Sequence, residues 1–381
     1  MTTSVCLVGA GESPYTRHPD DATTTPAVLA DAVRRALADA GLASTDVDGL
    51  GVCSFTLGPD HAIDLAWRMG LKLSWLMQDT NGGASAGSML QHAVRAIEAG
   101  DANVIVLVAG DRMDASAFSR LVAEYNSATA DHLSPLPMSG PNGLFAMVTQ
   151  RQMAATGLEP ADYGRLVVAQ REWASLNPGA VYRAPLTLDD YLAAPFVAPP
   201  LRRYDCVPPV TGADAVVITS DERAGGAPRA RVSAVVARYN VDDQSGAGLV
   251  TGLRECAGDL WDSASADPAD VDVVSVYDDY PSMVVAQLVD LGIPGDGDLR
   301  AFLRDEVASR RLPVNTSGGQ LSAGQAGSAG GMHGLVEVAQ QLMGRAGNRQ
   351  VDARVGVVSG YGMVLYRFGS CANATVLEAA A

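Results

Sequence analysis

Lysine, cysteine and long apolar runs are scarce in this sequence of 381 residues. Lys72 is the only lysine, and 43 acidic residues outnumber 27 basic ones, which gives a formal net charge of −16. An acidic balance of this size argues against a nucleic-acid surface or a polybasic membrane contact. It still allows a local arginine cluster to hold phosphate groups. The pair Arg202 and Arg203 is one candidate, and the alternative is a solvated pair on the surface.

The five cysteines are scattered along the chain and form no CxxC pair. An odd number at these spacings predicts neither a disulfide framework nor a zinc site, so we expect no metal. No stretch approaches the roughly 20 apolar residues that a transmembrane helix requires, and the N-terminus lacks the charged n-region of a signal peptide. The sequence therefore predicts a reduced, cytoplasmic protein.

Strand and helix patterns alternate through the first hundred residues, which is typical of a layered α/β fold. Apolar runs at 4–9, 47–53 and 104–109 predict strands, and the patterns at 26–40 and 92–98 predict helices. The run VIVLVA at 104–109 is continuously apolar, which indicates a central strand covered on both faces. With 48% hydrophobic residues, the chain can bury the core of two domains.

The pattern changes from about residue 115 to 201, where prolines cluster and two helical segments follow at 144–157 and 161–174. We interpret this region as a helical loop domain inserted into the N-terminal half. Strand patterns then return at five places, which are 213–219, 231–239, 271–277, 355–358 and 374–377. The sequence thus predicts an N-terminal half over 1–220, with the insertion inside it, and a C-terminal half over 221–381.

A glycine-rich segment at 314–334, VNTSGGQLSAGQAGSAGGMHG, stands between a predicted strand end and a helix whose apolar positions include Leu335 and Leu342. Glycine lets the backbone approach a ligand closely, and a helix N-terminus favours an anion or a developing oxyanion. A second such turn, NGGASAGSML, follows Thr80 at a comparable place in the first half. The two turns predict a duplicated architecture whose helix N-termini converge.

The stretch NTSGGQLSAGQAGSAGG resembles the C-terminal loop of thiolases, most closely that of the sterol-carrier-protein-x-like or lipid-transfer-protein branch, which reads roughly NxxGGxxxxGHPxGAxG. The resemblance extends over nearly the whole chain. It implies the thiolase fold, an α/β architecture with a duplicated, layered α/β/α/β/α core and a helical loop domain inserted in the N-terminal half. It also implies a homodimer.

Three positions depart from the catalytic pattern of thiolases. Gly83, in GASAGSML, lies where that family has its nucleophilic cysteine, and Gln325 replaces its histidine. The second cysteine motif, CxGG, is matched by Ser359 to Gly362. Glutamine cannot shuttle a proton near neutral pH, although its amide can donate a hydrogen bond to an oxyanion. Thiolysis through an acyl-enzyme is therefore not expected.

Three tyrosines occur at positions that match catalytic loops of the family. Tyr277 and Tyr280 lie in VYDDYPS, and Tyr361 lies in the loop that matches CxGG. A phenol can donate a hydrogen bond to an enolate or accept the proton of a β-hydroxyl group, and the alternative is an ordinary packing role. Asp278 and Asp279 either orient a phenol or form the turn before the next helix.

We expect Tyr277, Tyr280 and Tyr361 to be catalytic. The expected oxyanion and substrate loop consists of Gln325, Gly83, Gly362 and Ser359. For His333, about one turn into its helix, we favour packing or capping.

Within the superfamily the sequence resembles proteins that lack the catalytic Cys and His, among them the aldolases of steroid side-chain degradation. This resemblance implies retro-aldol cleavage of a β-hydroxyacyl-CoA into a ketone and a shorter acyl-CoA, with CoA as part of the substrate and no permanently bound cofactor. It also implies a small OB-fold, zinc-binding, hydratase-associated partner protein. Two alternatives remain open, namely an acyltransferase or condensing subunit and a non-catalytic acyl-CoA-binding scaffold.

Overall fold

The computed structural model describes residues 3–124, 126–133, 135–136, 140–241, 249–365 and 368–380. Nine strands form one mixed sheet in the order β3-β2-β4-β7-β1-β8-β11-β10-β9, and β5 pairs separately with β6. The strands are β1 Val5–Glu12, β2 Gly49–Cys53, β3 Trp75–Asp79, β4 Val104–Asp111, β5 Phe196–Ala198, β6 Leu201–Arg202, β7 Gly212–Ser220, β8 Arg229–Tyr239, β9 Val273–Ser275, β10 Val355–Leu365 and β11 Phe368–Ala380.

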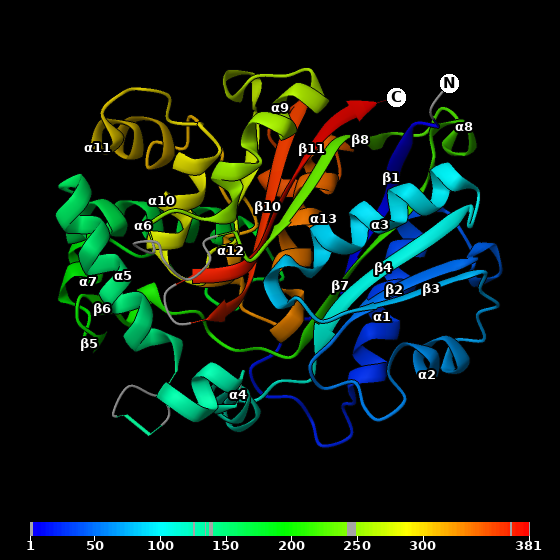
Figure 1. The fold of residues 1–381 in the computed structure, drawn as a ribbon, viewed down its shortest axis with the longest axis horizontal. Coiled ribbons are helices and arrows are strands. Elements are labelled where there is room, and N and C mark those ends of the chain that lie inside the picture. Colours follow the sequence, from blue (N-terminus) through cyan, green and yellow to red (C-terminus); the bar gives the residue numbers. More distant parts are fainter. Residues whose placement is uncertain are drawn as a thin grey trace.

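The α-helices lie on both faces of this sheet and in the inserted region (Figure 1). They are α1 Thr25–Ala40, α2 His61–Arg68, α3 Ser85–Ala99, α4 Ala115–Ala123, α5 Pro141–Thr156, α6 Pro160–Leu176, α7 Leu188–Ala193, α8 Asp221–Ala224, α9 Ala257–Ala264, α10 Pro281–Asp290, α11 Leu299–Phe302, α12 Gly319–Ala323 and α13 Gly330–Leu342. In the described part of the chain, none of these helices has the length and apolar character needed to cross a bilayer.

The two halves repeat one strand order. The N-terminal strands lie in the order β3-β2-β4-β7-β1. The C-terminal strands β9-β10-β11-β8 correspond to β2-β4-β7-β1, and a single parallel bridge between Val274 and Val314 stands in place of a partner to β3. The halves join where β1 pairs antiparallel with β8, at Cys6–Arg231 and Leu7–Ala230. The predicted duplicated, layered α/β architecture is confirmed. The boundary between residues 220 and 221 is consistent with this join and stays a prediction.

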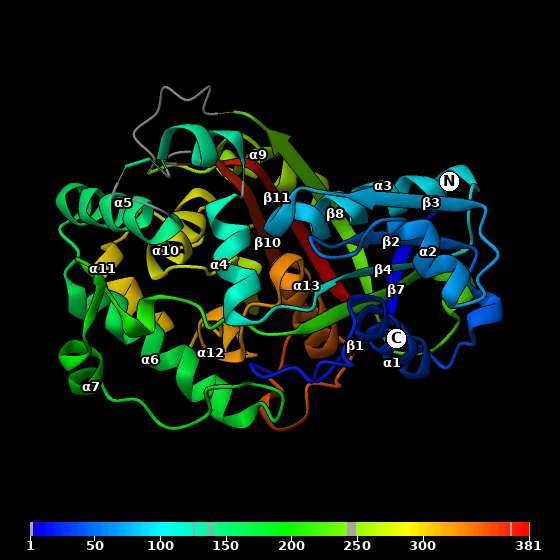
Figure 2. The same ribbon diagram turned by 90° about the horizontal axis from the view of Figure 1, so that it is seen from below.

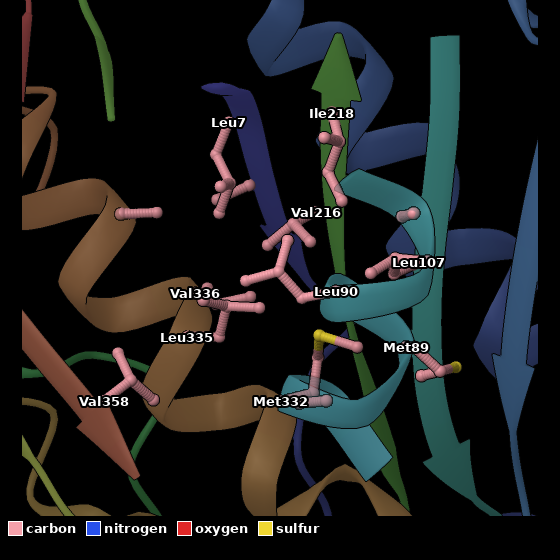
Figure 3. Close-up of a cluster of buried hydrophobic side chains, with 14 of the residues drawn as sticks. Leu7, Met89, Leu90, Leu107, Val216, Ile218, Met332, Leu335, Val336 and Val358 are labelled. Carbon is pink, nitrogen blue, oxygen red and sulfur yellow. The ribbon is translucent and has the colours of Figure 1, made fainter. Parts of the chain in front are cut away.

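Five layers follow from the helix contacts. On the outer faces, α1 packs on β1, β4 and β7, and α9 packs on β8 and β11. Between the halves, α3 and α13 each contact strands of both. Figure 3 shows Met332 and Leu335 of α13 facing Met89 and Leu90 of α3. This apolar middle layer places the N-termini of two helices next to each other.

The central strand β4 shows why its sequence is continuously apolar. Successive side chains of a strand point to opposite faces of the sheet. Ile105 and Leu107 accordingly belong to the cluster around α3 and α13, whereas Val106 and Val108 belong to the cluster under α1. Helices therefore cover both faces of β4, as predicted, and a polar residue at any of these four positions would be buried.

The inserted region contributes α4 to α7 and the short pair β5 and β6, between β4 and β7 in the chain. In space it packs mainly against the other half, because α5 and α6 contact α10 and α6 contacts α12 (Figure 2). The strand predicted over 271–277 is shorter than expected, since β9 ends at Ser275. The chain there leaves the sheet to form a loop between the two halves and the insertion.

Candidate active site

A cleft with an empty volume of about 840 Å³, open to solvent, lies where the insertion meets the two halves. Every predicted site residue except Ser359 lines it. These residues are Tyr277, Tyr280, Tyr361, Gln325, Gly83 and Gly362. The insertion contributes apolar lining, which includes Phe118 and Leu121 of α4 and Leu144 and Phe145 of α5.

The loop after β9 carries the polar side of the cleft and is held at both ends. The Asn315 side-chain Oδ1 accepts a hydrogen bond from the Val276 peptide N–H at 2.9 Å. The pairing of β9 with β10 ends one residue earlier, at Ser275. The Gln287 side chain of α10 donates to the Tyr277 carbonyl at 2.6 Å. Pro281 begins α10, a position that tolerates the missing N–H. The backbone of 277–280 is thereby fixed before any ligand binds.

Asp279 lies at the centre of a polar cluster in this cleft. The Tyr277 hydroxyl donates to Asp279 Oδ2 at 3.0 Å, and Gln325 Nε2 donates to Asp279 Oδ1 at 2.7 Å. The same Gln325 nitrogen lies 3.3 Å from the Tyr277 oxygen. Burial raises the pKa of Asp279 to about 7, the hydrogen bond from Tyr277 opposes the rise, and the neighbouring Asp278 carboxylate adds to it. Asp279 can therefore exchange a proton near neutral pH.

The adjacent Asp278 points away from the cleft and holds the glycine-rich loop. Its carboxylate accepts hydrogen bonds from the peptide nitrogens of Gln320 and Leu321 at 2.9 and 3.3 Å, and from Gln170 Nε2 at 2.6 Å. A side chain on Gly319, whose φ is +58°, would overlap this carboxylate. Asp278 thus positions the start of α12, whereas Asp279 faces the substrate space.

Tyr280 is fastened to the insertion. Its hydroxyl donates to Asn142 Oδ1 at 2.7 Å, and its ring stacks on Phe145 with centroids 4.6 Å apart. Burial raises the pKa of the Tyr280 phenol well above its ordinary value, and the Asp279 carboxylate raises it further. The geometry therefore favours a positioning role for Tyr280, in which it holds α5 against the loop.

Tyr361 lies in β10 with its ring buried against the neighbouring strand β11. Its phenol oxygen accepts a hydrogen bond from the Gly369 peptide N–H, and a side chain at Gly369 would overlap the Tyr361 ring. A hydroxyl group that accepts a hydrogen bond becomes a stronger donor. Tyr361 lines the same cleft as Tyr277, so its phenol is suited to donating toward a bound oxyanion.

Ser359 lies behind the cleft rather than in it. Its hydroxyl donates to Gln287 Oε1 at 2.8 Å, and the amide nitrogen of the same Gln287 holds the Tyr277 carbonyl. The structure therefore places Ser359 in the support of the Tyr277 loop. Gly362, in contrast, lines the cleft, and a side chain there would overlap the backbone of Asn81.

Comparison with known proteins shows the family to which this chain belongs. A family model described as Thiolase C-terminal domain-like matches residues 233–377. A 17-hydroxy-3-oxo-4-pregnene-20-carboxyl-CoA lyase of Mycobacterium tuberculosis is 32% identical over 91% of this chain and 94% of its own length. This chain belongs to the thiolase superfamily. A steroid side-chain-cleaving aldolase of Thermomonospora curvata is 29% identical over 94% of this chain and 96% of its own.

Among solved structures, the Ltp2-ChsH2(DUF35) aldolase superposes on this thiolase-superfamily chain with a TM-score of 0.85 at 26% identity. The match covers 99% of this chain and 98% of the other. An acetyl-CoA acetyltransferase of Syntrophomonas wolfei superposes with a TM-score of 0.72 at 14% identity, which shows the shared fold alone.

The surroundings of Gly83, which we predicted to lie at the nucleophile position of thiolases, leave no room for a side chain. A Cβ atom built on Gly83 would overlap the ring of Tyr277 and the carbonyl of Tyr361. The tyrosine ring thus fills the space into which a nucleophilic side chain would project. In this thiolase-superfamily chain, the Tyr277 ring and a side chain at position 83 therefore exclude each other.

The cysteines of this chain do not supply a nucleophile to the cleft. Within the described residues, none of the five lines the cleft. Burial raises the pKa of Cys53 and of Cys206 to about 12 and that of Cys371 to about 11. A thiol with a raised pKa is protonated at neutral pH and a poor nucleophile. The site supports acid–base chemistry rather than acyl transfer to sulfur.

Sequence reasoning missed two features of the site. It gave two alternatives for Asp279, orientation of a phenol or formation of a turn. The sequence Asp278-Asp279 does not indicate which of the two carboxylates faces a cleft. It also predicted no helix at 115–123, within the insertion, although Phe118, Leu121 and Val122 of α4 line the cleft. The amphipathic pattern of these residues was the available signal.

His333 does more than the predicted packing or capping. It is buried, and its Nδ1 lies 3.0 Å from Glu12 Oε1 and 3.6 Å from Asp214 Oδ2, while its Nε2 lies 2.8 Å from Ser317 Oγ. Tyr15 donates to Asp214 at 2.6 Å. Burial alone would lower the pKa of His333, but the two carboxylates raise it well above its ordinary value. The network ties β1 and β7 to α13.

Proposed function

We propose that this chain cleaves a β-hydroxyacyl-CoA thioester by a retro-aldol reaction, giving a ketone and a shorter acyl-CoA. The observation that carries the proposal is the cluster of Asp279, Tyr277 and Gln325 in a cleft that no described cysteine lines. Retro-aldol cleavage needs a base for the hydroxyl proton and a donor for the enolate oxygen, and it needs no nucleophile. CoA enters as part of the substrate.

In the proposed reaction the β-hydroxyl group of the substrate hydrogen-bonds to the Tyr277 oxygen. Its proton moves to Tyr277 while the phenol proton moves to Asp279 along the 3.0 Å hydrogen bond between them. The O–H electron pair becomes the ketone C=O bond, and the Cα–Cβ bond breaks. Its electron pair forms the thioester enolate, whose oxygen receives a hydrogen bond from Tyr361. Return of the proton through Tyr277 to Cα completes the shorter acyl-CoA.

The apolar wall of the cleft supports a bulky, apolar acyl group. Burying such a group against aromatic and aliphatic side chains supplies binding free energy of about 25 cal/mol per Å². Phe118, Leu121 and Phe145 offer this surface in the cleft that the polar cluster also lines. Because two relatives are named for steroid substrates, we propose a steroid side-chain thioester as the substrate.

The partners follow from the relatives and from the sheet edge. We propose a DUF35-type partner, of the small OB-fold, zinc-binding kind, since the aldolase of similar structure is named with one.

We also propose a homodimer, because β3 forms an edge of the sheet and Ile63, Trp67 and Leu76 nearby are exposed. Light scattering that gives the mass of a monomer at micromolar concentration would contradict the dimer. A cytoplasmic location stays a prediction.

The test is incubation of the purified chain, with and without its DUF35-type partner, with a tertiary β-hydroxyacyl-CoA and no added CoA. We expect a ketone and propionyl- or acetyl-CoA, and no mass increment on the protein. Binding of the thioester without cleavage under both conditions would favour the scaffold alternative. A covalent acyl group on the protein would favour the acyltransferase alternative.

A further inference from the structure

A second pocket adjoins the cleft and is lined by three arginines. Its empty volume is about 600 Å³, it is open to solvent, and Arg17, Arg171 and Arg203 line it. No aspartate or glutamate belongs to its described lining, although the chain carries a net charge of −16. Val207 lines both this pocket and the cleft. A positive pocket on an acidic protein attracts anions of a matching size.

Arg171 is the unusual member of this arginine pocket because it is only 5% exposed. Its Nε donates to Ser322 Oγ at 2.9 Å, and its guanidinium carbon lies 5.2 Å and 5.6 Å from the ring centres of Tyr182 and Tyr204. Across the described ranges, no carboxylate forms an ion pair with it. The two aromatic faces offset part of the charge, but a buried guanidinium with no anion nearby is costly.

Two other arginines line the pocket together with Arg171. Arg17 and Arg203 are exposed, and the Arg17 guanidinium lies 5.5 Å from the same Tyr182 ring. Three guanidinium groups around one pocket offer the donor geometry that phosphate oxygens favour. Ordinary surface arginines are solvated singly, whereas these converge from β1–α1, α6 and the segment after β6.

The arginine pocket is linked to the catalytic cluster through neighbouring residues. Gln170, adjacent to Arg171 in α6, donates to Asp278 at 2.6 Å, and Asp278 precedes Asp279. Leu321, whose amide also donates to Asp278, lines the arginine pocket. A ligand that spans both cavities would therefore pass Val207 and reach Tyr277.

We propose that the arginine pocket binds the phosphate groups of the CoA portion of the substrate, while the pantetheine arm passes Val207 into the cleft. The choice of CoA as the bearer of these phosphates rests on the proposed function. The pocket would then fix the thioester against Tyr277 and Asp279 through groups remote from the reacting bond.

The test is calorimetric binding of CoA, 3′-dephospho-CoA, pantetheine and inorganic phosphate to the full chain, with its partner where one is needed for folding. For CoA we expect the dissociation constant to rise at least tenfold in Arg203→Gln and Arg17→Gln, and more in Arg171→Gln. Pantetheine should bind weakly and equally to all variants. Arg183→Gln is the matched control, because Arg183 is exposed, lies next to Tyr182 and does not line the pocket.

Arg203 and Arg17 are exposed, so their variants keep the test informative if Arg171→Gln fails to fold. Unchanged CoA binding in both exposed variants would overturn the inference while leaving the cleavage reaction intact. Binding of inorganic phosphate without binding of CoA would also overturn it, since the pocket would then be a site for a small free anion. Cleavage activity plays no part in this readout, so failure of the proposed function is recognised separately.

Discussion

At the scale of single residues, Asp279 differs from Asp278 by the direction in which its carboxylate points. One carboxylate faces the cleft beside Tyr277, and the other accepts peptide N–H groups behind it. Burial raises the pKa of both, to about 7 for Asp279 and about 6 for Asp278. Only a group that reaches the substrate space can act as a base, so geometry rather than pKa assigns the role to Asp279.

Replacing Asp279 by asparagine should lower kcat by about 10²- to 10⁴-fold, because the proton acceptor is lost. The wild-type rate should fall as pH decreases through about 7, since Asp279 then gains a proton and cannot accept another. This acid limb should disappear in Asp279→Asn. Rates of ketone release across pH 5 to 9 check the prediction. An unchanged acid limb in Asp279→Asn would assign the base elsewhere.

Tyr277→Phe should lose most of its turnover as well, because the proton relay to Asp279 is broken while the ring still packs on Gly83. Tyr239→Phe is the control, since that tyrosine is 49% exposed and its hydroxyl bonds only to Ser88 in the described contacts. Single-turnover rates compare the two. Equal activity of both variants would contradict the relay.

Gly83 and Tyr277 form a steric pair that a double-mutant cycle can measure. Gly83→Ala should destabilise the fold by about 1–3 kcal/mol, because the added methyl group overlaps the Tyr277 ring. In a Tyr277→Ala background the same change should cost less, since the ring is gone. Urea unfolding of the wild type, the two single variants and the double variant gives the coupling free energy between the two positions. If the two changes in unfolding free energy simply add, the overlap is relieved by some movement other than removal of the ring.

At the scale of elements, the loop between β9 and α10 acts together with α12. Asp278 joins them by accepting two peptide N–H groups of the α12 start and the amide of Gln170 in α6. Three separate segments thus depend on one buried carboxylate. This arrangement explains what holds α12, a helix of only five residues between Gly318 and Gly324, in its place.

Asp278→Ala should reduce stability by about 2–4 kcal/mol, because it leaves several buried donors without an acceptor. Hydrogen exchange should increase over residues 315–325 in particular. Asp298→Ala is the comparison, since Asp298 also accepts two peptide N–H groups but lies exposed at the start of α11, where a lost cap costs about 1 kcal/mol. Equal losses in the two variants would contradict the burial argument.

At the scale of the whole molecule, the two halves are connected by charge as well as by the apolar layer between α3 and α13. Glu12 and Asp214 face each other across β1 and β7, and His333 reaches them from α13 in the other half. Because the carboxylates favour the protonated imidazole, the network links the assembly of the halves to pH.

His333→Gln should destabilise the protein by about 3–5 kcal/mol at pH 6, since the buried Asp214 and the half-buried Glu12 lose their cation. The pKa of His333 is higher in the folded protein than in the unfolded chain. Its stabilisation is therefore fully present below pH 6.5 and is lost as pH rises through the folded-state pKa. The difference in unfolding free energy between wild type and variant should shrink toward high pH. A difference that grows toward high pH would contradict the assignment.

The sequence by itself determined the layered α/β class and predicted the duplication. Strand and helix periodicity and glycine-rich turns are local properties that can be read along the chain. Through its resemblance to thiolases the sequence also predicted that Gly83 stands in place of the nucleophile and that Tyr277 and Gln325 are site residues. It could not show that their side chains meet, because they are 48 positions apart.

Only the tertiary structure decided which polar groups act together. Whether Asp278 or Asp279 faces the cleft depends on how the loop after β9 is held by Asn315 and Gln287. Whether Arg17 and Arg171 share a pocket depends on how the insertion docks against the two halves. Such docking is set by the burial of apolar surface between elements distant in the chain, which no local pattern encodes.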